Sequence, residues 1–396
     1  MNPNDSSSSM SGLMRGRAWC IACGLVLLWV ACGCRAPRSN FVVGLYGVDR
    51  IEDLSVAKEA GFDVVVGPAS RPYFDAAHEL GMRVFAFPGT SAGPSFDTNA
   101  AARAVASLDR HPALFAWYLV DEPDFNHIHP AWVLEARRSL RRMRARAPLA
   151  VVFQHGAEVS DYREAGDLLM VDRYPVAWQP LSVFEQHVRM AQRSAGGKPF
   201  YAILQAFDWS AFPHLLPGES GFREPTFQEL RCMTYGALVQ RAQGLFYYSY
   251  RANRWQLDQH PELWASLKRI VAEIRAWQPL FEAEHGWWPW RQSLIYEEAS
   301  RLNEVQESRV SLAWLRVSEG NEAVPPGEYI LAVNNTSTEA KFRISPPVVS
   351  TARMPVVGSK ETKLVQQGWF SDTLEGYGAR VYGPVPIHPM FAPRMR

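Results

Sequence analysis

Two adjacent carboxylates, Asp121 and Glu122, end an apolar and aromatic run that begins at Leu114, and Pro123 follows them directly. A run rich in β-branched and aromatic residues predicts a buried strand. A carboxyl at the end of such a strand, in apolar surroundings, keeps its proton to a higher pH and can act as a general acid or base. We therefore take Glu122 as the candidate acid/base. Strand alternation turns Asp121 away from Glu122 unless a bulge brings both side chains inward.

Other strand-like runs also end in polar or aromatic residues. Asp172 and Asp208 are candidates for a second catalytic carboxylate. The candidates for substrate contact are Tyr46, Arg71, His155, Tyr174, Gln205, Trp209 and Tyr248. The one H-x-H pair, His127 and His129, falls in the loop between the fourth strand and the next helix rather than on either element, and no H-E-x-x-H motif occurs, so we expect neither a metal nor a cofactor. No serine or cysteine nucleophile arrangement is evident, and no lysine ends a strand as a lyase would need.

The elements that would position these residues alternate regularly. Eight strand-like runs are each followed by a helical segment, and several of those segments end at a glycine. The runs are residues 41–48, 63–68, 82–89, 114–123, 149–156, 167–176, 200–209 and 244–250. Eight such pairs over roughly 240 residues match a (β/α)8 TIM barrel, whose active site lies at the carboxyl ends of its strands. An open doubly wound sheet is the alternative, but no glycine-rich phosphate fingerprint follows the first run.

The pattern changes after residue 286. Short alternating runs at 310–317, 328–334, 340–344 and 378–382 are separated by turn residues, which predicts a small all-β sandwich. The predicted domains are a signal segment (1–34), a barrel (41–284) and a sandwich (290–388). Six arginines between residues 137 and 146 lie on the helix predicted after the fourth strand, and we expect them to form a solvated outer face.

Composition narrows the choice of partners and compartment. With 41 basic and 40 acidic residues the net charge is +1, which gives no reason to expect nucleic acid as a partner. The 14 tryptophans suit stacking on sugars. Arg15 and Arg17 precede an apolar run at 18–31, which is typical of a secretory signal. Small residues before Cys32 and Cys34 resemble a bacterial lipoprotein cleavage box, although Trp29 departs from it. We therefore expect export to the cell envelope, with lipidation of Cys32 or Cys34 anchoring the protein to a membrane.

The D-E-P sequence after the fourth run resembles the end of strand four in the clan-A glycoside hydrolases, which are retaining (β/α)8 enzymes. In that family an Asn-Glu pair at this place carries the general acid/base, which aligns with Glu122, while Asp121 replaces the usual Asn. The last run, residues 370–383, is similar to the terminal strands of their accessory domains. The resemblance implies a glycoside hydrolase that acts on a poly- or oligosaccharide.

One departure from that family leaves the mechanism open. The family's nucleophile is a Glu at the end of strand seven, where this chain has Gln205, and an amide cannot replace it. In one explanation Asp172 or Asp208 supplies the second carboxylate, at a spacing that would decide the stereochemistry. In another, Asp121 and Glu122 act like the Asp-Glu pair of substrate-assisted hexosaminidases, where the substrate's 2-acetamido group attacks. In the third, the barrel is degenerate and the protein is a non-catalytic cell-surface glycan-binding protein.

Overall fold

A computed structural model of the chain describes residues 41–286, 294–296, 309–346 and 352–385. The predicted signal segment and its two candidate lipidation sites, Cys32 and Cys34, lie outside these residues. Within the described segments, no helix combines the length and apolar character needed to cross a membrane.

Eight parallel strands form a closed barrel in chain order. They are β1 (Val42–Leu45), β2 (Val64–Val66), β3 (Arg83–Ala86), β4 (Leu114–Asp121), β5 (Leu149–Phe153), β6 (Leu168–Asp172), β7 (Phe200–Gln205) and β8 (Gly244–Tyr248). The barrel closes where β1 pairs with β8, with Val42 opposite Gly244. This closure confirms the predicted (β/α)8 barrel and excludes the open sheet.

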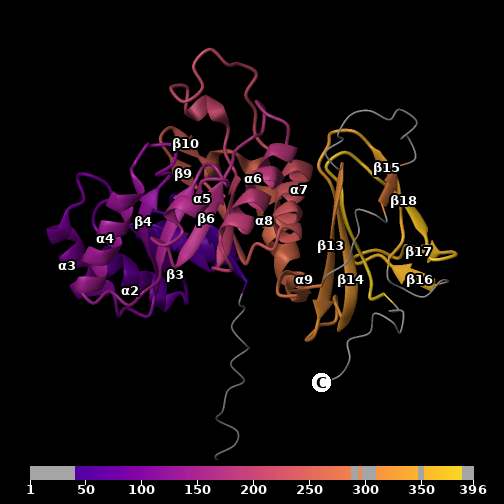
Figure 1. Ribbon diagram of the computed structural model, residues 1–396, viewed down its shortest axis with the longest axis horizontal. Coiled ribbons are helices and arrows are strands. Elements are labelled where there is room, and N and C mark those ends of the chain that lie inside the picture. Colours follow the sequence, from indigo (N-terminus) through magenta and orange to yellow (C-terminus); the bar gives the residue numbers. More distant parts are fainter. Residues whose placement is uncertain (1–40, 287–293, 297–308, 347–351, 386–396) are drawn as a thin grey trace, which may run out of the picture. The chain divides into compact units, whose positions relative to one another are not determined.

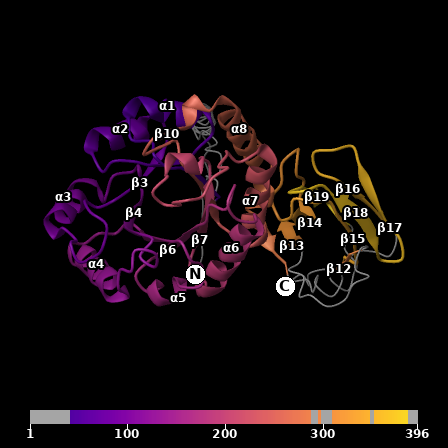
Figure 2. The same ribbon diagram turned by 90° about the horizontal axis from the view of Figure 1, so that it is seen from above.

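Helices surround the strands in a ring (Figure 2). They are α1 (Ile51–Glu59), α2 (Arg71–Glu79), α3 (Thr98–Leu108), α4 (Pro130–Arg142), α5 (Val159–Tyr162), α6 (Ser182–Ser194), α7 (Phe227–Val239) and α8 (Pro261–Ala276). Short elements interrupt the loops: η1 (Trp209–Ala211), β9 (Arg251–Ala252), β10 (Trp255–Gln256), η2 (Leu257–Gln259) and α9 (Gln278–Phe281). Helix α7 begins with a capping box, in which Thr226 and Glu229 satisfy each other's backbone N–H groups.

Alternation along the strands separates two apolar cores. Side chains that point into the barrel, such as Phe85, Tyr118 and Phe246, form one buried cluster. Those that point outward, such as Val84 and Leu119, pack with the surrounding helices in another. Because the strands are buried on both faces, they read as continuous apolar runs in the sequence.

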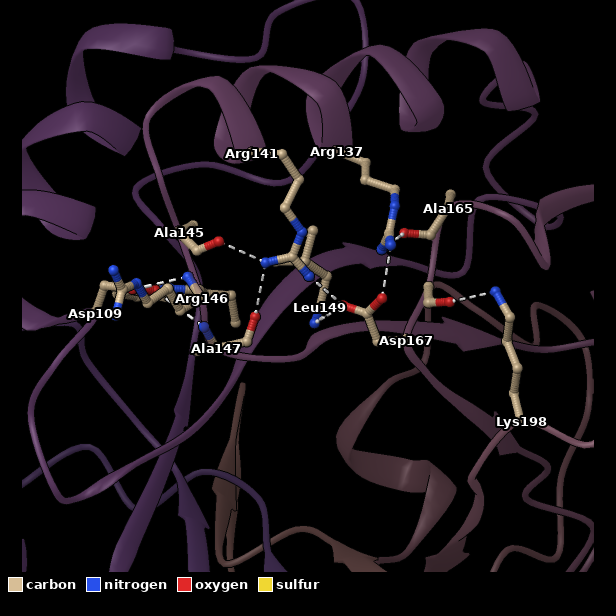
Figure 3. Close-up of polar contacts among 12 residues, drawn as sticks. Asp109, Arg137, Arg141, Ala145, Arg146, Ala147, Leu149, Ala165, Asp167 and Lys198 are labelled. Carbon is tan, nitrogen blue, oxygen red and sulfur yellow. Dashed lines mark hydrogen bonds and ion pairs between the residues drawn. The ribbon is translucent and has the colours of Figure 1, made fainter.

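Two arginines of α4 anchor the helix to the strands rather than facing solvent (Figure 3). Arg137 Nη2 lies 2.7 Å from Asp167 Oδ1, and Arg141 also pairs with this carboxylate. Asp167 accepts the Leu149 N–H at 2.9 Å as well. The expectation of a solvated face holds for Arg142, which pairs with the exposed Glu135, but it is wrong for Arg137 and Arg141.

The C-terminal part is all-β, as predicted. One antiparallel sheet contains β11 (Glu284–His285), β13 (Val310–Val317), β14 (Gly327–Asn334) and β19 (Ala379–Tyr382). A second contains β12 (Leu294–Tyr296), β15 (Ala340–Ile344) and β18 (Phe370–Leu374), and a ribbon joins β16 (Ala352–Pro355) to β17 (Thr362–Val365) (Figure 1). Leu312, Ile330, Phe342 and Phe370 share its buried core. β11 pairs with β13, so this sheet includes Glu284 and His285.

Candidate active site

A pocket of about 460 Å³ opens at the carboxyl ends of the barrel strands. Its polar lining residues are Tyr46, Tyr118, Asp121, Glu122, Gln154, His155, Asp172, Arg173, Tyr174 and Tyr248. Its apolar lining residues are Phe125, Trp178, Phe207, Trp209, Phe212, Leu215 and Leu216. A pocket of this size, with a few convergent polar groups and titratable side chains, has the features of a binding or catalytic site.

A bulge in β4 turns Asp121 into this pocket. The pairing of β4 with β5 shifts register between Tyr118 and Val120. As a result Leu119 and Val120 both pack in the outer core, whereas Tyr118 belongs to the inner one. The extra residue reverses the alternation, so that Asp121 follows Tyr118 on the inward side.

Glu122 reaches the same pocket through its backbone conformation. Its φ of +41° lies in the left-handed region, which non-glycine residues seldom adopt. The Glu122 N–H donates to Val152 O at 2.9 Å, and the Asn126 side-chain amide donates to Glu122 O at 3.0 Å. The same turn is tied to β5 by Asp124, which accepts the His155 N–H at 2.6 Å. Strand pairing and this turn together fix the direction of the carboxyl.

The carboxyl groups of Glu122 and Asp172 are hydrogen-bonded to each other. Burial raises the pKa of Glu122 to about 7, with the charges of Asp121 and Asp124 adding to the rise and the bond to Asp172 opposing it. Burial, followed by the charge of Glu122, raises the pKa of Asp172 well above its ordinary value. Asp172 is only 4% exposed, so its carboxyl ionises less readily than that of an ordinary aspartate.

Asp121 is held by a chain of phenols. Tyr118 donates its hydroxyl hydrogen to Asp121 Oδ1, and Tyr46 donates to Tyr118 at 3.4 Å. Burial raises the pKa of Asp121, and the Tyr118 hydrogen bond opposes this rise. Although Asp121 lies deep among protein atoms, its side chain is open to the solvent of the pocket. It is therefore an oriented, accessible hydrogen-bond acceptor.

Aromatic rings form one side of the pocket. Tyr174 stacks on Tyr248 with ring centroids 5.5 Å apart. Phe207 meets Trp209 edge-on at 4.9 Å, and Trp178 meets Trp209 edge-on at 5.9 Å. The Trp209 indole N–H donates to Tyr174 O at 3.1 Å, which locks this wall to the loop after β6. Rigid ring faces of this kind suit the C–H face of a sugar or another apolar group.

A cationic corner lies beside the carboxyls. Arg173 Nη2 donates to Gln179 Oε1 at 2.9 Å, and its guanidinium lies 5.5 Å from the centroid of the Trp178 ring. The positive charge of Arg173 lowers the pKa of Glu122. Behind it, burial and this charge lower the pKa of His187 to about 4, so His187 is neutral at neutral pH.

Three predicted site residues do not line the pocket. Gln205 is 0% exposed, and its amide bonds to the backbone of Val176 and Phe207, so it holds a loop rather than a substrate. Asp208 caps η1 by accepting the Ser210 N–H at 2.7 Å. Arg71 begins α2 and pairs with Asp75 at 3.0 Å. The other predicted residues, Tyr46, Asp121, Glu122, His155, Asp172, Tyr174, Trp209 and Tyr248, lie together in the lining.

Sequence reasoning missed several lining residues. Arg173 follows the last residue of β6, where alternation no longer assigns a side. Tyr118 could have been found by alternation, but only if the bulge after it had been known. Phe125, Leu215 and Leu216 lie in loops, and no local pattern marks them as pocket residues. Among the described residues, no group of three or more His, Cys, Asp or Glu is arranged to hold a metal ion.

The sequence matches no protein-family model and no curated protein. Solved structures do match its fold. An α-amylase from Geobacillus thermoleovorans complexed with acarbose superposes with a TM-score of 0.51 at 10% identity, over 87% of this chain and 98% of that one. AmyP in complex with maltose gives 0.53 at 7% identity, over 89% and 98%. An Anoxybacillus α-amylase gives 0.51 at 11% identity, over 88% and 99%. The chain therefore has the (β/α)8 fold of these glycoside hydrolases, followed by an all-β domain.

Proposed function

We propose that this protein is a glycoside hydrolase in which Glu122 protonates the leaving glycosidic oxygen. The observation that carries the proposal is a carboxyl with a pKa near 7 inside a pocket that aromatic rings line on one side. In the first step, Glu122 gives its proton to the oxygen as the bond from that oxygen to the anomeric carbon breaks and a nucleophile, either Asp121 or a group of the substrate, bonds to that carbon. In the second step, the resulting carboxylate takes a proton from the attacking water.

The contact between Glu122 and Asp172 argues against Asp172 as the partner on the other face of the sugar. Catalytic carboxyls stand about 5–5.5 Å apart in retaining enzymes and about 6.5–9.5 Å apart in inverting ones, whereas these two are hydrogen-bonded. Asp172 instead keeps Glu122 oriented and tunes its proton affinity. Because Asp208 lies outside the pocket lining, Asp121 is the remaining second carboxylate. It would act directly on the substrate or orient a substrate group that attacks.

The test is a hydrolysis screen of an oligosaccharide and glycoside library, with the product anomer followed by NMR. We expect the wild-type chain to cleave at least one member. Glu122→Gln should lower turnover by about a thousandfold or more, because the acid step is lost. Asp208→Asn is the matched control, since asparagine keeps the cap of η1 and the residue lies outside the pocket. Full turnover by the Glu122→Gln variant would contradict the proposal.

The second candidate is a non-catalytic glycan-binding protein. The observation in its favour is that Asp172 is too close to Glu122 to serve across the scissile bond, and that an amide, Gln205, ends β7. The same library, read by calorimetric binding, separates the two. Binding without any product, equal in the wild type and Glu122→Gln, would favour this candidate.

We also propose that the chain is exported and anchored in a membrane by a lipid on Cys32 or Cys34. The proposal rests on the charged-then-apolar order of residues 15–31 and the small residues before each cysteine. Cell fractionation of the single and double Cys→Ala variants tests it. Detergent-free release of the double variant, but not of the wild type, is the expected result.

A further inference from the structure

The pocket changes character from its floor to its rim. The floor consists of buried polar groups, with Asp172, Tyr118 and Tyr46 almost inaccessible to solvent. At the rim, Phe125 is 46% exposed and Leu215 is 47% exposed, although both side chains are large and apolar. The pocket thus combines buried polar groups with two strongly exposed apolar side chains at its opening, which they share with the exposed Asp121 and the partly exposed Arg173.

This rim is more apolar than the rest of the described surface would lead one to expect. In residues 41–286, 309–346 and 352–385, the large apolar side chains with comparable exposure are Ile51, Leu80, Phe125, Trp132, Leu215 and Leu364. Two of these six border the one pocket that holds the carboxyl pair, and they come from different loops. Leu216 lines the pocket beside Leu215. Exposed apolar groups gathered at one opening mark a binding surface.

The two loops are tied down at the rim. Phe125 lies in the turn that Asp124 fastens to β5. The loop after β7 is held where Asn253 Nδ2 donates to Ala211 O at 2.8 Å, and the Leu215 N–H donates to Phe212 O at 3.0 Å. In Figure 1 this segment projects past the strand ends, at the top of the view. The leucines are therefore presented at the entrance by a bonded framework.

The apolar side chains of the rim determine which kind of ligand group can bind against them. A leucine side chain has no donor, no acceptor and no ring face, so a sugar hydroxyl placed against it would lose water without gaining a hydrogen bond. An alkyl or aryl group would instead remove apolar surface from water on both sides. A pocket of about 460 Å³ lies in the range that buries a drug-sized ligand.

Resting on the proposed function, we infer that the substrate is a glycoside with an apolar aglycone, of the alkyl-glycoside or glycolipid class. The sugar lies on the polar floor, and the aglycone passes between Phe125 and the Leu215–Leu216 pair. Phe125 is on the same turn as Glu122, the acid that protonates the oxygen between sugar and aglycone. The apolar rim is thus on the leaving-group side of the cleaved bond.

The test uses methyl, n-butyl and n-octyl glycosides of the common hexoses and N-acetylhexosamines in both anomers, below their micelle concentrations. Calorimetry on the Glu122→Gln protein gives a Kd ratio of methyl to octyl for each headgroup. Full transfer of one methylene from water lowers Kd by about fourfold. Because the rim is partly open to solvent, each added methylene contributes only part of this effect. We therefore expect a methyl-to-octyl Kd ratio of about ten or more.

Variants of the rim residues show which side chains produce the dependence of Kd on chain length. In Leu215→Asn/Leu216→Asn the ratio should fall below about three, because the added carbons then meet amides. Phe125→Ser, on the other loop, should lower it independently, so the outcome does not depend on the folding of one variant. Leu364→Asn is the matched control: it removes a leucine that is 44% exposed on β17 and lies outside the pocket lining, and its ratio should match that of the parent.

Each result decides the inference. A ratio near one for every headgroup, no measurable binding of any octyl glycoside, or a ratio unchanged in both rim variants would overturn it. Hydrolysis of methyl glycosides by the wild type without any chain-length dependence would overturn it while leaving the proposed function intact. Chain-length-dependent binding without hydrolysis would support the apolar site and contradict the proposed function.

Discussion

Glu122 and Asp172 share a hydrogen bond between their carboxyl groups, across the ends of β4 and β6. Burial raises the pKa of both, the charge of Glu122 raises the pKa of Asp172 further, and the hydrogen bond from Asp172 lowers the pKa of Glu122. The pair therefore titrates as a unit and keeps at least one proton through the neutral range. This relationship sets the expected pH behaviour of the site.

Activity should fall on the alkaline side of pH 7. Glu122 must be protonated to act as the acid, and its pKa is about 7, so kcat/KM should drop about tenfold for each pH unit above that value. Replacing Asp172 by Ala removes the hydrogen bond that lowers this pKa, so the alkaline limb should move to higher pH. Asp172→Asn keeps a donor to Glu122 and should leave the limb near its wild-type position. A pH–rate profile of the three proteins measures the shift. An alkaline limb at the same pH in all three would contradict the assignment of this limb to Glu122.

Stability should decline between about pH 4.5 and pH 7, below the range in which activity falls. Glu122 has a folded-state pKa of about 7 against an ordinary value of 4.5, so its stabilising contribution is complete below about pH 4.5 and is lost as pH rises through 7. Glu122→Gln cannot lose a proton and should escape this loss. After allowance for partial exposure, we expect the variant to gain about 1–2 kcal/mol relative to wild type between pH 5 and pH 8. Urea unfolding of both proteins at the two pH values measures this gain. If the unfolding free energy of the two proteins changed equally between these pH values, the linkage would be refuted.

Removing the phenol that holds Asp121 should reduce turnover. Tyr118→Phe deletes the hydroxyl that donates to Asp121 Oδ1, so the pKa of Asp121 should rise further and its orientation should loosen. A hydrogen bond to a charged group is worth about 1.5–3 kcal/mol, which corresponds to a loss of about ten- to a hundredfold in kcat. Tyr201→Phe, also inside the barrel but outside the pocket lining, is the control. Equal kinetics for the two variants would remove Asp121 from the mechanism.

The helix anchor should matter for folding but not for chemistry. Asp167→Ala leaves the half-buried Arg137 and Arg141 without their shared carboxylate and removes the acceptor of the Leu149 N–H. We expect a loss of about 2–3 kcal/mol in the free energy of unfolding. Glu135→Ala, which removes an exposed pair with Arg142, should cost under about 1 kcal/mol. Chemical denaturation of both variants tests the contrast.

The sequence predicted strands correctly where the strand itself is buried and therefore apolar along its length. The predicted 310–317 and 340–344 runs match β13 and β15, and each of the eight predicted barrel runs contains a strand, because buried strands carry a dense apolar signal. β16 and β17, four residues each, have too few residues for a period to be recognised.

The site residues show the same limit. Glu122 and Asp172 were found because they end strands, and strand ends meet at one face of a barrel. Gln205 also ends a strand, yet its amide is used by the backbone of Val176, a partner 29 residues away that no local pattern reveals. The rim leucines were missed for the opposite reason: a loop leucine becomes part of a pocket only through the loops that the fold brings opposite it.

The left-handed backbone of Glu122 has an evolutionary consequence. Glycine would adopt this φ freely, whereas a side chain there costs on the order of 1 kcal/mol. Selection for thermal tolerance alone would therefore favour Glu122→Gly, which relieves both the backbone and the buried charge. A lineage that retains glutamate here is being selected for what the carboxyl does, and a glycine at this position in a related sequence would mark a descendant that has given up the reaction.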